Sequence, residues 1–309
     1  MIPVNSVLQV GQFPEIMQLE IDKRLITSKL LDPQGKLPDG SFTAILTRSN
    51  TQLPKELFEQ IPSIKMVATC GVGYDNLPLG FLKANGIKAS NTPGVLNDAV
   101  CELAIGMLFG LLRRIPEAQA FVKSAAWSQA PFPITTTLAG KCVGIAGMGR
   151  IGQDLAKRLE PFKVKLAYTG PSKKDLPYEY HSNIQSLAKA CDILMLACPA
   201  TPETEKMIGK AVLEALGPTG YLINIARGSV VDEPALLVAL QQKKIAGAAL
   251  DVFENEPNPN LKFLNLDNVL LTPHIGSATS ETRQLMTNLA IDNLEAFYNQ
   301  QPLLTEVIN

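Results

Sequence analysis

The chain has 309 residues, is 46% hydrophobic and 18% charged, and carries a formal net charge of −1. This length and composition predict two domains of roughly 100–200 residues each, with a large buried core, and exclude a disordered chain. The balanced charge, without a block of lysine or arginine, disfavours nucleic acid and anionic membranes as partners. A small-molecule substrate is the better expectation.

The first residues and the cysteines indicate a cytoplasmic protein. Residues 1–10 lack the basic and apolar regions of a secretion signal, and no apolar run reaches the roughly 20 residues that span a bilayer. The five cysteines are odd in number, widely spaced and without a C-x-x-C pair. This usage is typical of reduced core residues rather than of a metal or redox site. They are Cys70, Cys101, Cys142, Cys191 and Cys198.

The first third of the chain alternates short apolar runs with helix-like stretches. Continuously apolar strands are typical of a sheet that helices cover on both faces, and the alternation predicts right-handed crossovers in a doubly wound parallel sheet. Strands are predicted at residues 7–10, 43–47, 64–69 and 87–90, with helical segments at 53–61 and 77–86.

A long helical pattern follows at residues 97–115, apolar on most faces and therefore typical of a buried helix. After it comes a second strand series, which predicts a second α/β domain of the same kind. These strands are expected at residues 142–147, 164–169, 192–198, 221–226, 246–252 and 268–274.

The first strand of this second series runs into the sequence "GMGRIG", with the G-x-G-x-x-G spacing at Gly147, Gly149 and Gly152. Between a strand and a helix, the first glycine permits a tight turn, the second lets the backbone approach a pyrophosphate, and the third permits close helix–strand packing. The helix N-terminus then offers unpaired amides to the phosphates. An ordinary strand–helix turn is the alternative.

The next strand ends where a dinucleotide-binding fold normally carries an acidic residue. That acid binds the ribose hydroxyls of NAD and repels a 2′-phosphate, and Gly170 stands in its place. Ser172, Lys173 and Lys174 follow and suit a phosphomonoester, although lysines also occur in solvated loops. The sequence therefore favours NADP(H), with NAD(H) as a second cofactor.

Only two histidines are available as an acid/base. His181 lies among polar residues that we predict to be a loop, whereas His274 closes a buried strand, at the end where ligands bind in open parallel sheets. Arg227 and the pair Glu254 and Glu256 also follow strands, where a charged side chain is costly unless solvated, paired or used. These strand ends predict Arg, Glu and His gathered around a bound nicotinamide.

The tail carries one more helical pattern at residues 280–298, with Ser280 as the predicted N-cap. We expect this helix and the one at 97–115 to join the two domains.

In its ordered motifs, nearly the whole chain resembles the D-isomer-specific 2-hydroxyacid dehydrogenases, and within them the glyoxylate/hydroxypyruvate and hydroxyphenylpyruvate reductase branch. The resemblance rests on "VATCGVGYDNLPL", "NTPGVLNDAVCELA", "GIAGMGRIG", "LINIARGSVVDEPAL", "GAALDVFENEP" and "LLTPHIGSAT". It implies a Rossmann-type cofactor domain at residues 97–283 and a flavodoxin-like substrate domain at 1–96 and 284–309, flanking a cleft.

The resemblance also implies roles for single residues. Arg227 matches the arginine that binds the substrate carboxylate and keto oxygen, and Glu256 matches the carboxylate that pairs with the catalytic histidine, His274. His274 would donate a proton to the carbonyl oxygen during reduction and remove it during oxidation. Val72 and Gly73 match the loop whose amides hold the substrate carboxylate.

Cofactor contacts follow from the same resemblance. Asp251 matches an aspartate near the nicotinamide amide, and Pro171 departs from the arginine that NADP-using relatives commonly place there, so 2′-phosphate recognition depends on Ser172 and Lys173. The remaining cofactor positions are Arg150, Ile151, Cys198, Ile225, Ala226 and Gly276.

The resulting expectation is a cytosolic, homodimeric enzyme without a metal, which reduces glyoxylate or hydroxypyruvate to the D-2-hydroxy acid with NADPH. In the family the region around Trp127 forms the dimer interface, and buried packing is an equally good interpretation of Trp127. Two alternatives stay open: an NAD(H)-linked dehydrogenase for 2-ketogluconate or an aromatic pyruvate, and a nucleotide-sensing binding protein like the corepressors built on this fold.

Overall fold

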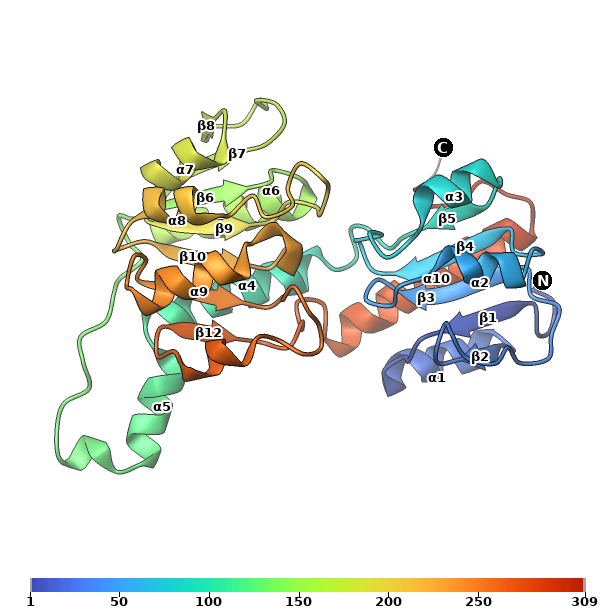
Figure 1. The fold of residues 1–309 in the computed structure, drawn as a ribbon, viewed down its shortest axis with the longest axis horizontal. Helices are drawn as coiled ribbons and strands as arrows, with labels where there is room; N and C mark the ends of the chain where they lie inside the picture. The colour runs from blue at the N-terminus through green and yellow to red at the C-terminus, as the bar shows by residue number, and fades with distance from the viewer. Residues whose placement is uncertain (1, 308–309) are drawn as a thin grey trace. The chain divides into compact units, whose positions relative to one another are not determined.

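The computed structural model describes residues 2–307 and divides the chain into two compact units, Met1–Leu96 with Ser277–Asn309, and Asn97–Gly276. Each unit contains one wholly parallel sheet (Figure 1). The chain returns to the first unit at residue 277, earlier than residue 284 expected from the sequence, because all of helix α10 packs against α1 and β4 of that unit.

The first unit is built on a five-stranded sheet in the order β2-β1-β3-β4-β5. This is the flavodoxin-like doubly wound order, as predicted. Its elements are β1 (Val7–Val10), α1 (Glu15–Arg24), β2 (Ser28–Leu30), β3 (Ala44–Arg48), α2 (Lys55–Gln60), β4 (Met66–Cys70), α3 (Leu79–Ala84), β5 (Lys88–Ser90) and α10 (Ser280–Tyr298).

The second unit is built on a seven-stranded sheet in the order β12-β11-β10-β9-β6-β7-β8, which is the Rossmann order with β12 added at one edge. It begins with α4 (Asn97–Leu112), α5 (Ile115–Lys123) and η1 (Ala126–Ser128). The sheet and its helices follow as β6 (Cys142–Ala146), α6 (Arg150–Leu159), η2 (Glu160–Phe162), β7 (Lys165–Thr169), β8 (Glu179–His181), α7 (Ile184–Ala190), β9 (Ile193–Leu196), α8 (Lys210–Leu216), β10 (Tyr221–Asn224), η3 (Gly228–Val230), α9 (Glu233–Gln241), β11 (Gly247–Leu250), η4 (Leu261–Asn265) and β12 (Val269–Leu271).

The apolar strands of this sheet bury both of their faces, which is why they read as unbroken apolar runs. Successive side chains alternate between two cores: Ile193 and Met195 of β9 pack with α4 and α6, whereas Leu194 and Leu196 pack with α7, α8 and α9. The alternation follows from the two-residue period of a strand. The sheet is therefore held rigidly from both sides, and its carboxyl edge is left for the loops.

Two edge strands were missed, and two local predictions were wrong. β2 and β8 are short and partly exposed, so their sequences show no apolar run, and His181 belongs to β8 rather than to a loop. Helix α10 is capped by Thr279, whose Oγ1 accepts from the Thr282 amide, instead of by Ser280. The expected helix at 97–115 ends at Leu112, because Arg114 adopts a φ of +51° before Pro116 opens α5.

All five cysteines are free thiols, as predicted, and burial raises the pKa of Cys70, Cys101 and Cys191 to about 12. Within residues 2–307, no helix is long and apolar enough to cross a bilayer.

Candidate active site

The turn between β6 and α6 is closed by two glycines that no other residue can replace without movement. Gly147 has a φ of +99°, and a Cβ there would lie 2.6 Å from the Cys198 nitrogen. A Cβ on Gly152 would collide with the carbonyl oxygen of Gly147. The backbones of three segments therefore pack in direct contact at this turn: the end of β6, the start of α6 and the chain after β9.

Gly149 belongs to the same turn, but its surroundings are open rather than crowded. Among residues 2–307, no heavy atom outside Gly149 and its two chain neighbours lies within 4 Å of the position its Cβ would take, so a side chain there would fill open space rather than clash. Gly149 is also the N-cap of α6 and offers no side chain to the first amides of the helix. Open space in front of uncapped amides fits the pyrophosphate of a dinucleotide. Arg150 and Ile151 are the first two residues of α6.

The loop after β7 begins beside this turn, since the Gly147 amide donates to the Thr169 carbonyl oxygen at 3.0 Å. Gly170 has open space around its Cβ position, and Ser172 and Lys173 are exposed. In the chain from residue 2 to 307, neither side chain makes a hydrogen bond or ion pair. The loop thus offers a hydroxyl and an ammonium at the place where the adenine ribose of a dinucleotide lies in this fold.

Cys198, Ile225 and Ala226 lie just beyond the ends of β9 and β10, on the carboxyl edge of the sheet. Burial raises the pKa of the Cys198 thiol to about 11, so the group stays protonated and unreactive at neutral pH. The side chains of Ile225 and Ala226 are apolar, so none of the three residues offers a reactive group at neutral pH.

A buried asparagine, Asn224, shapes the turn that carries Arg227. The Asn224 side chain donates to the Arg227 carbonyl oxygen at 2.9 Å and accepts from the Ala226 amide at 3.0 Å. Arg227 Nη1 donates to the Ala226 carbonyl oxygen at 2.8 Å, and the guanidinium charge lowers the pKa of Glu256. Asn224 was not among the predicted site residues, although a polar residue closing an apolar strand was the available signal.

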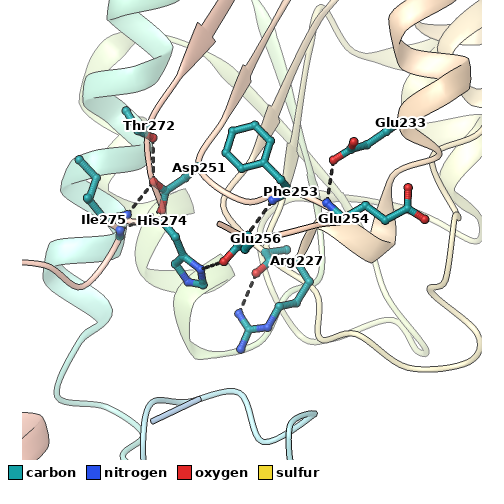
Figure 2. Close-up of polar contacts among 11 residues, drawn as sticks. Arg227, Glu233, Asp251, Phe253, Glu254, Glu256, Thr272, His274 and Ile275 are labelled. Atoms are coloured by element: carbon teal, nitrogen blue, oxygen red, sulfur yellow. Dashed lines mark hydrogen bonds and ion pairs between the residues drawn. The ribbon is translucent and has the colours of Figure 1, made fainter. Parts of the chain in front are cut away.

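The two groups predicted to form the acid/base pair do meet. His274 Nδ1 lies 2.6 Å from Glu256 Oε2, and Glu256 Oε1 accepts from the Phe253 amide at 3.0 Å (Figure 2). Burial acts to raise the pKa of Glu256, but its hydrogen bond to His274 and the charges of His274 and Arg227 hold that pKa below its ordinary value. An ionised Glu256 fixes the imidazole by Nδ1 and leaves Nε2 as the outer nitrogen of the ring.

His274 is held in place from a second side by Asp251. His274 has a φ of +53°, and the chain around it is pinned by the buried Asp251 carboxylate, which accepts from Thr272 Oγ1 at 2.7 Å and from the Ile275 and Gly276 amides at 2.8 Å. Burial raises the pKa of Asp251, and these hydrogen bonds oppose the rise. The geometry thus gives Asp251 a task beside the one the family resemblance implies, namely to orient the turn bearing His274.

Glu254 points away from this pair. Its side chain forms an ion pair with Lys206 at 3.3 Å, and its amide donates to Oε1 of the largely buried Glu233 at 2.7 Å (Figure 2). Glu233, which the sequence did not single out, therefore anchors the loop that carries Glu256.

Val72 and Gly73 lie in the first unit, directly after β4. The Val72 carbonyl oxygen accepts from Asn91 Nδ2 at 2.8 Å. Gly71 has a φ of +153°, and a Cβ at this position would collide with the Ser49 side chain. Within residues 2–307 the amides of Val72 and Gly73 have no hydrogen-bond acceptor. Two fixed, unpaired amides fit a carboxylate ligand.

The chain is similar to known proteins over most of its length. Residues 105–276 match the family model described as "D-isomer specific 2-hydroxyacid dehydrogenase, NAD binding domain". The chain is 41% identical to the hydroxyphenylpyruvate reductase of Plectranthus scutellarioides over 98% of this chain and 99% of that protein. It is 42% identical to a glyoxylate/hydroxypyruvate reductase A of Arabidopsis thaliana, over 87% and 86% of the two chains.

Among solved structures, it is similar to the NADPH-dependent glyoxylate/hydroxypyruvate reductase of Sinorhizobium meliloti in complex with NADP and malonate. The two chains are 38% identical, with a TM-score of 0.93 over 98% of this chain and 97% of the other.

The Glu256–His274 pair gives a pH-dependent prediction. Because the pKa of Glu256 is lowered in the folded chain, its ionised form contributes stability that is present above the ordinary value of 4.5 and is lost as the pH falls through the lowered pKa. Glu256→Gln is expected to reduce the free energy of unfolding by about 1–3 kcal/mol near neutral pH. This difference from the wild type should shrink in acid, as the pH falls below 4.5 and through the lowered pKa.

Urea unfolding of the wild type and of Glu256→Gln, near neutral pH and in acid, measures this difference in the free energy of unfolding. Glu254→Gln, a more exposed carboxylate on the same loop, is the matched control and should follow the wild-type profile. A Glu256→Gln deficit that is as large in acid as at neutral pH contradicts the assignment.

Proposed function

The chain belongs to the D-isomer specific 2-hydroxyacid dehydrogenase family, and on this basis we propose that it reduces a small 2-keto acid of the glyoxylate or hydroxypyruvate type to the D-2-hydroxy acid with NADPH. The family makes it an NAD(P)-dependent 2-keto acid reductase. The observation that carries the proposal is the His274–Glu256 hydrogen bond of 2.6 Å, formed on the carboxyl edge of the sheet that bears the glycine turn.

In this reaction the residues of the chain bind, orient and protonate the substrate. The glycine turn and the loop after β7 would hold NADPH, which would supply a hydride for the keto carbon. Arg227 binds the substrate carboxylate, and His274 Nε2 donates a proton to the keto oxygen as charge develops there. The Val72 and Gly73 amides of the first unit are proposed to bind a carboxylate as well. Glu256 stabilises the imidazolium that precedes this transfer and keeps Nδ1 bound, so only Nε2 exchanges a proton with substrate.

The preference for NADPH over NADH rests on the loop after β7. Gly170 brings no carboxylate to repel a 2′-phosphate, and the exposed Ser172 and Lys173 supply a hydroxyl donor and a cation. Pro171 supplies neither, so the preference is expected to be moderate.

Steady-state kinetics test the reaction and the cofactor preference together. We expect kcat/KM to be highest for glyoxylate or hydroxypyruvate, ahead of hydroxyphenylpyruvate and 2-ketogluconate, and about tenfold higher with NADPH than with NADH. Equal or better turnover with NADH refutes the cofactor preference. Failure of every keto acid to oxidise either cofactor refutes the reductase and favours a nucleotide-sensing binding protein.

The role of His274 is tested by His274→Asn. Asparagine tolerates the positive φ of this position, so the turn should be kept while the proton donor is lost. We expect kcat to fall about 10²- to 10⁴-fold, with binding of NADPH measured by fluorescence unchanged. His181→Asn, at the other histidine, should keep wild-type kcat; near-normal turnover of His274→Asn would show that another group protonates the substrate.

We further propose that the protein works as a homodimer through the segment that contains α5 and η1. Figure 1 shows α5 and the chain after it extending away from the sheet of the second unit. The segment exposes apolar side chains that a monomer leaves in water, including Ile115, Val122, Ile134 and Trp127, the last of which is 68% exposed.

Sedimentation velocity measures the oligomeric state. The wild type should sediment as a dimer and Trp127→Arg as a monomer, because a buried unpaired guanidinium opposes association. Leu261→Arg, an equally exposed apolar position outside the segment, is the control and should remain dimeric. A monomeric wild type rules out the dimer.

A further inference from the structure

The loop that follows β7 is tied to the sheet by a buried phenol. Tyr168 is the fourth residue of β7 and is 0% exposed. Its Oη accepts from the Lys174 amide at 2.7 Å and donates to the Lys174 carbonyl oxygen at 3.2 Å. One hydroxyl thus binds both the backbone amide and the backbone carbonyl of Lys174. It ties the end of the 170–174 loop back to β7, the strand from which the loop leaves.

A second tyrosine reaches the other end of the same loop. Tyr180 of β8 donates from Oη to the Gly170 carbonyl oxygen at 3.3 Å, and its ring packs on that of Tyr168 with centroids 5.3 Å apart. Neighbouring strands β7 and β8 pair Tyr168 with Tyr180, so the two phenols project from one face of the sheet edge. The loop is therefore fixed at its first and last residues.

The residues between these tethers are those without protein partners. Ser172 and Lys173 are exposed, and their side chains form no hydrogen bond or ion pair with any residue from 2 to 307. An exposed, untethered loop of this composition would sample many conformations, and ordering it on binding would weaken the affinity for its ligand.

We infer that Tyr168, with Tyr180 as a second tether, is a positioning residue that holds Ser172 and Lys173 ready for the 2′-phosphate of NADPH. The inference rests on the proposed function and extends it to residues that do not touch the cofactor phosphate. NADH has no 2′-phosphate for Ser172 and Lys173 to bind, so loosening the loop affects NADPH selectively.

Tyr168→Phe tests this directly, because it keeps the buried ring and removes only the hydroxyl. The variant removes both hydrogen bonds to Lys174 and keeps the ring contact with Tyr180, so the loop loosens while the sheet stays folded. We expect KM for NADPH to rise about fivefold, with kcat and KM for NADH unchanged. The affinity for adenosine 2′,5′-bisphosphate, measured by calorimetry, should fall by the same factor, and that for 5′-AMP should stay.

Two further phenylalanine variants complete the set. Tyr180→Phe removes the longer hydrogen bond and should raise KM for NADPH less than Tyr168→Phe does. Tyr178→Phe is the matched control, because its hydroxyl donates to Glu160 Oε1 at 2.7 Å and does not contact the loop, and it should behave as the wild type.

The outcomes separate this inference from the proposed function. If the wild type binds adenosine 2′,5′-bisphosphate no more tightly than 5′-AMP, the proposed NADPH preference is wrong and the inference falls with it. If the wild type discriminates and Tyr168→Phe discriminates equally well, only the inference is overturned. Parallel losses with NADPH and NADH, or a lower kcat, would give Tyr168 a general structural role and would also overturn it.

Discussion

Parallel strand pairing is the constraint on which the second unit depends. Because β6, β7, β9, β10 and β11 all run in one direction, their carboxyl ends meet at a single edge of the sheet. The glycine turn and the chain segments that bear Arg227, Glu256 and His274 all leave from that edge or from its neighbour β12. Strands covered on both faces cannot shift to accommodate a ligand, so adaptation is left to the loops, and the loops are in turn fixed by individual polar contacts.

Those contacts come largely from three shielded carboxylates, each with a different task. Glu233 anchors the amide of Glu254, Asp251 pins the turn around His274, and Glu256 pairs with the imidazole itself. Burying a carboxylate costs free energy unless amides or cations compensate it. Only Glu256, which gains the charges of His274 and Arg227, has a lowered pKa, whereas burial dominates in Asp251 and Glu233 and raises theirs. The surroundings of the three carboxylates thus favour the ionised form of Glu256, which pairs with His274, and disfavour that of Asp251 and Glu233, which hold loop amides.

Sequence reasoning predicted features that local chemistry dictates. Both doubly wound sheets were predicted because apolar runs reflect two buried faces. The strand ends predicted that Arg, Glu and His gather, whereas the choice of Glu256 as the partner of His274 came from the family resemblance. The short edge strands β2 and β8 were missed because a partly exposed strand needs no apolar run. Asn224 and Tyr168 were missed for a different reason: their tasks are set by which backbone groups the fold brings within reach, and single-residue patterns do not encode that.

The loop after β7 shows how this division of labour bears on cofactor choice. Recognition of a 2′-phosphate needs exposed, charged side chains, and such side chains cannot order a loop by burial. Here the loop is ordered by Tyr168, which is buried in the sheet. Because Tyr168 is not itself one of the exposed residues offered to the ligand, its burial takes nothing away from the surface that binds the phosphate. The loop residues are then free to differ, as Pro171 does from the arginine common in NADP-using relatives, without changing the backbone position that Lys174 and Gly170 define. In the proposed arrangement the tether, Tyr168, and the phosphate-binding groups, Ser172 and Lys173, are separate residues, so the strength of cofactor discrimination is expected to depend on both.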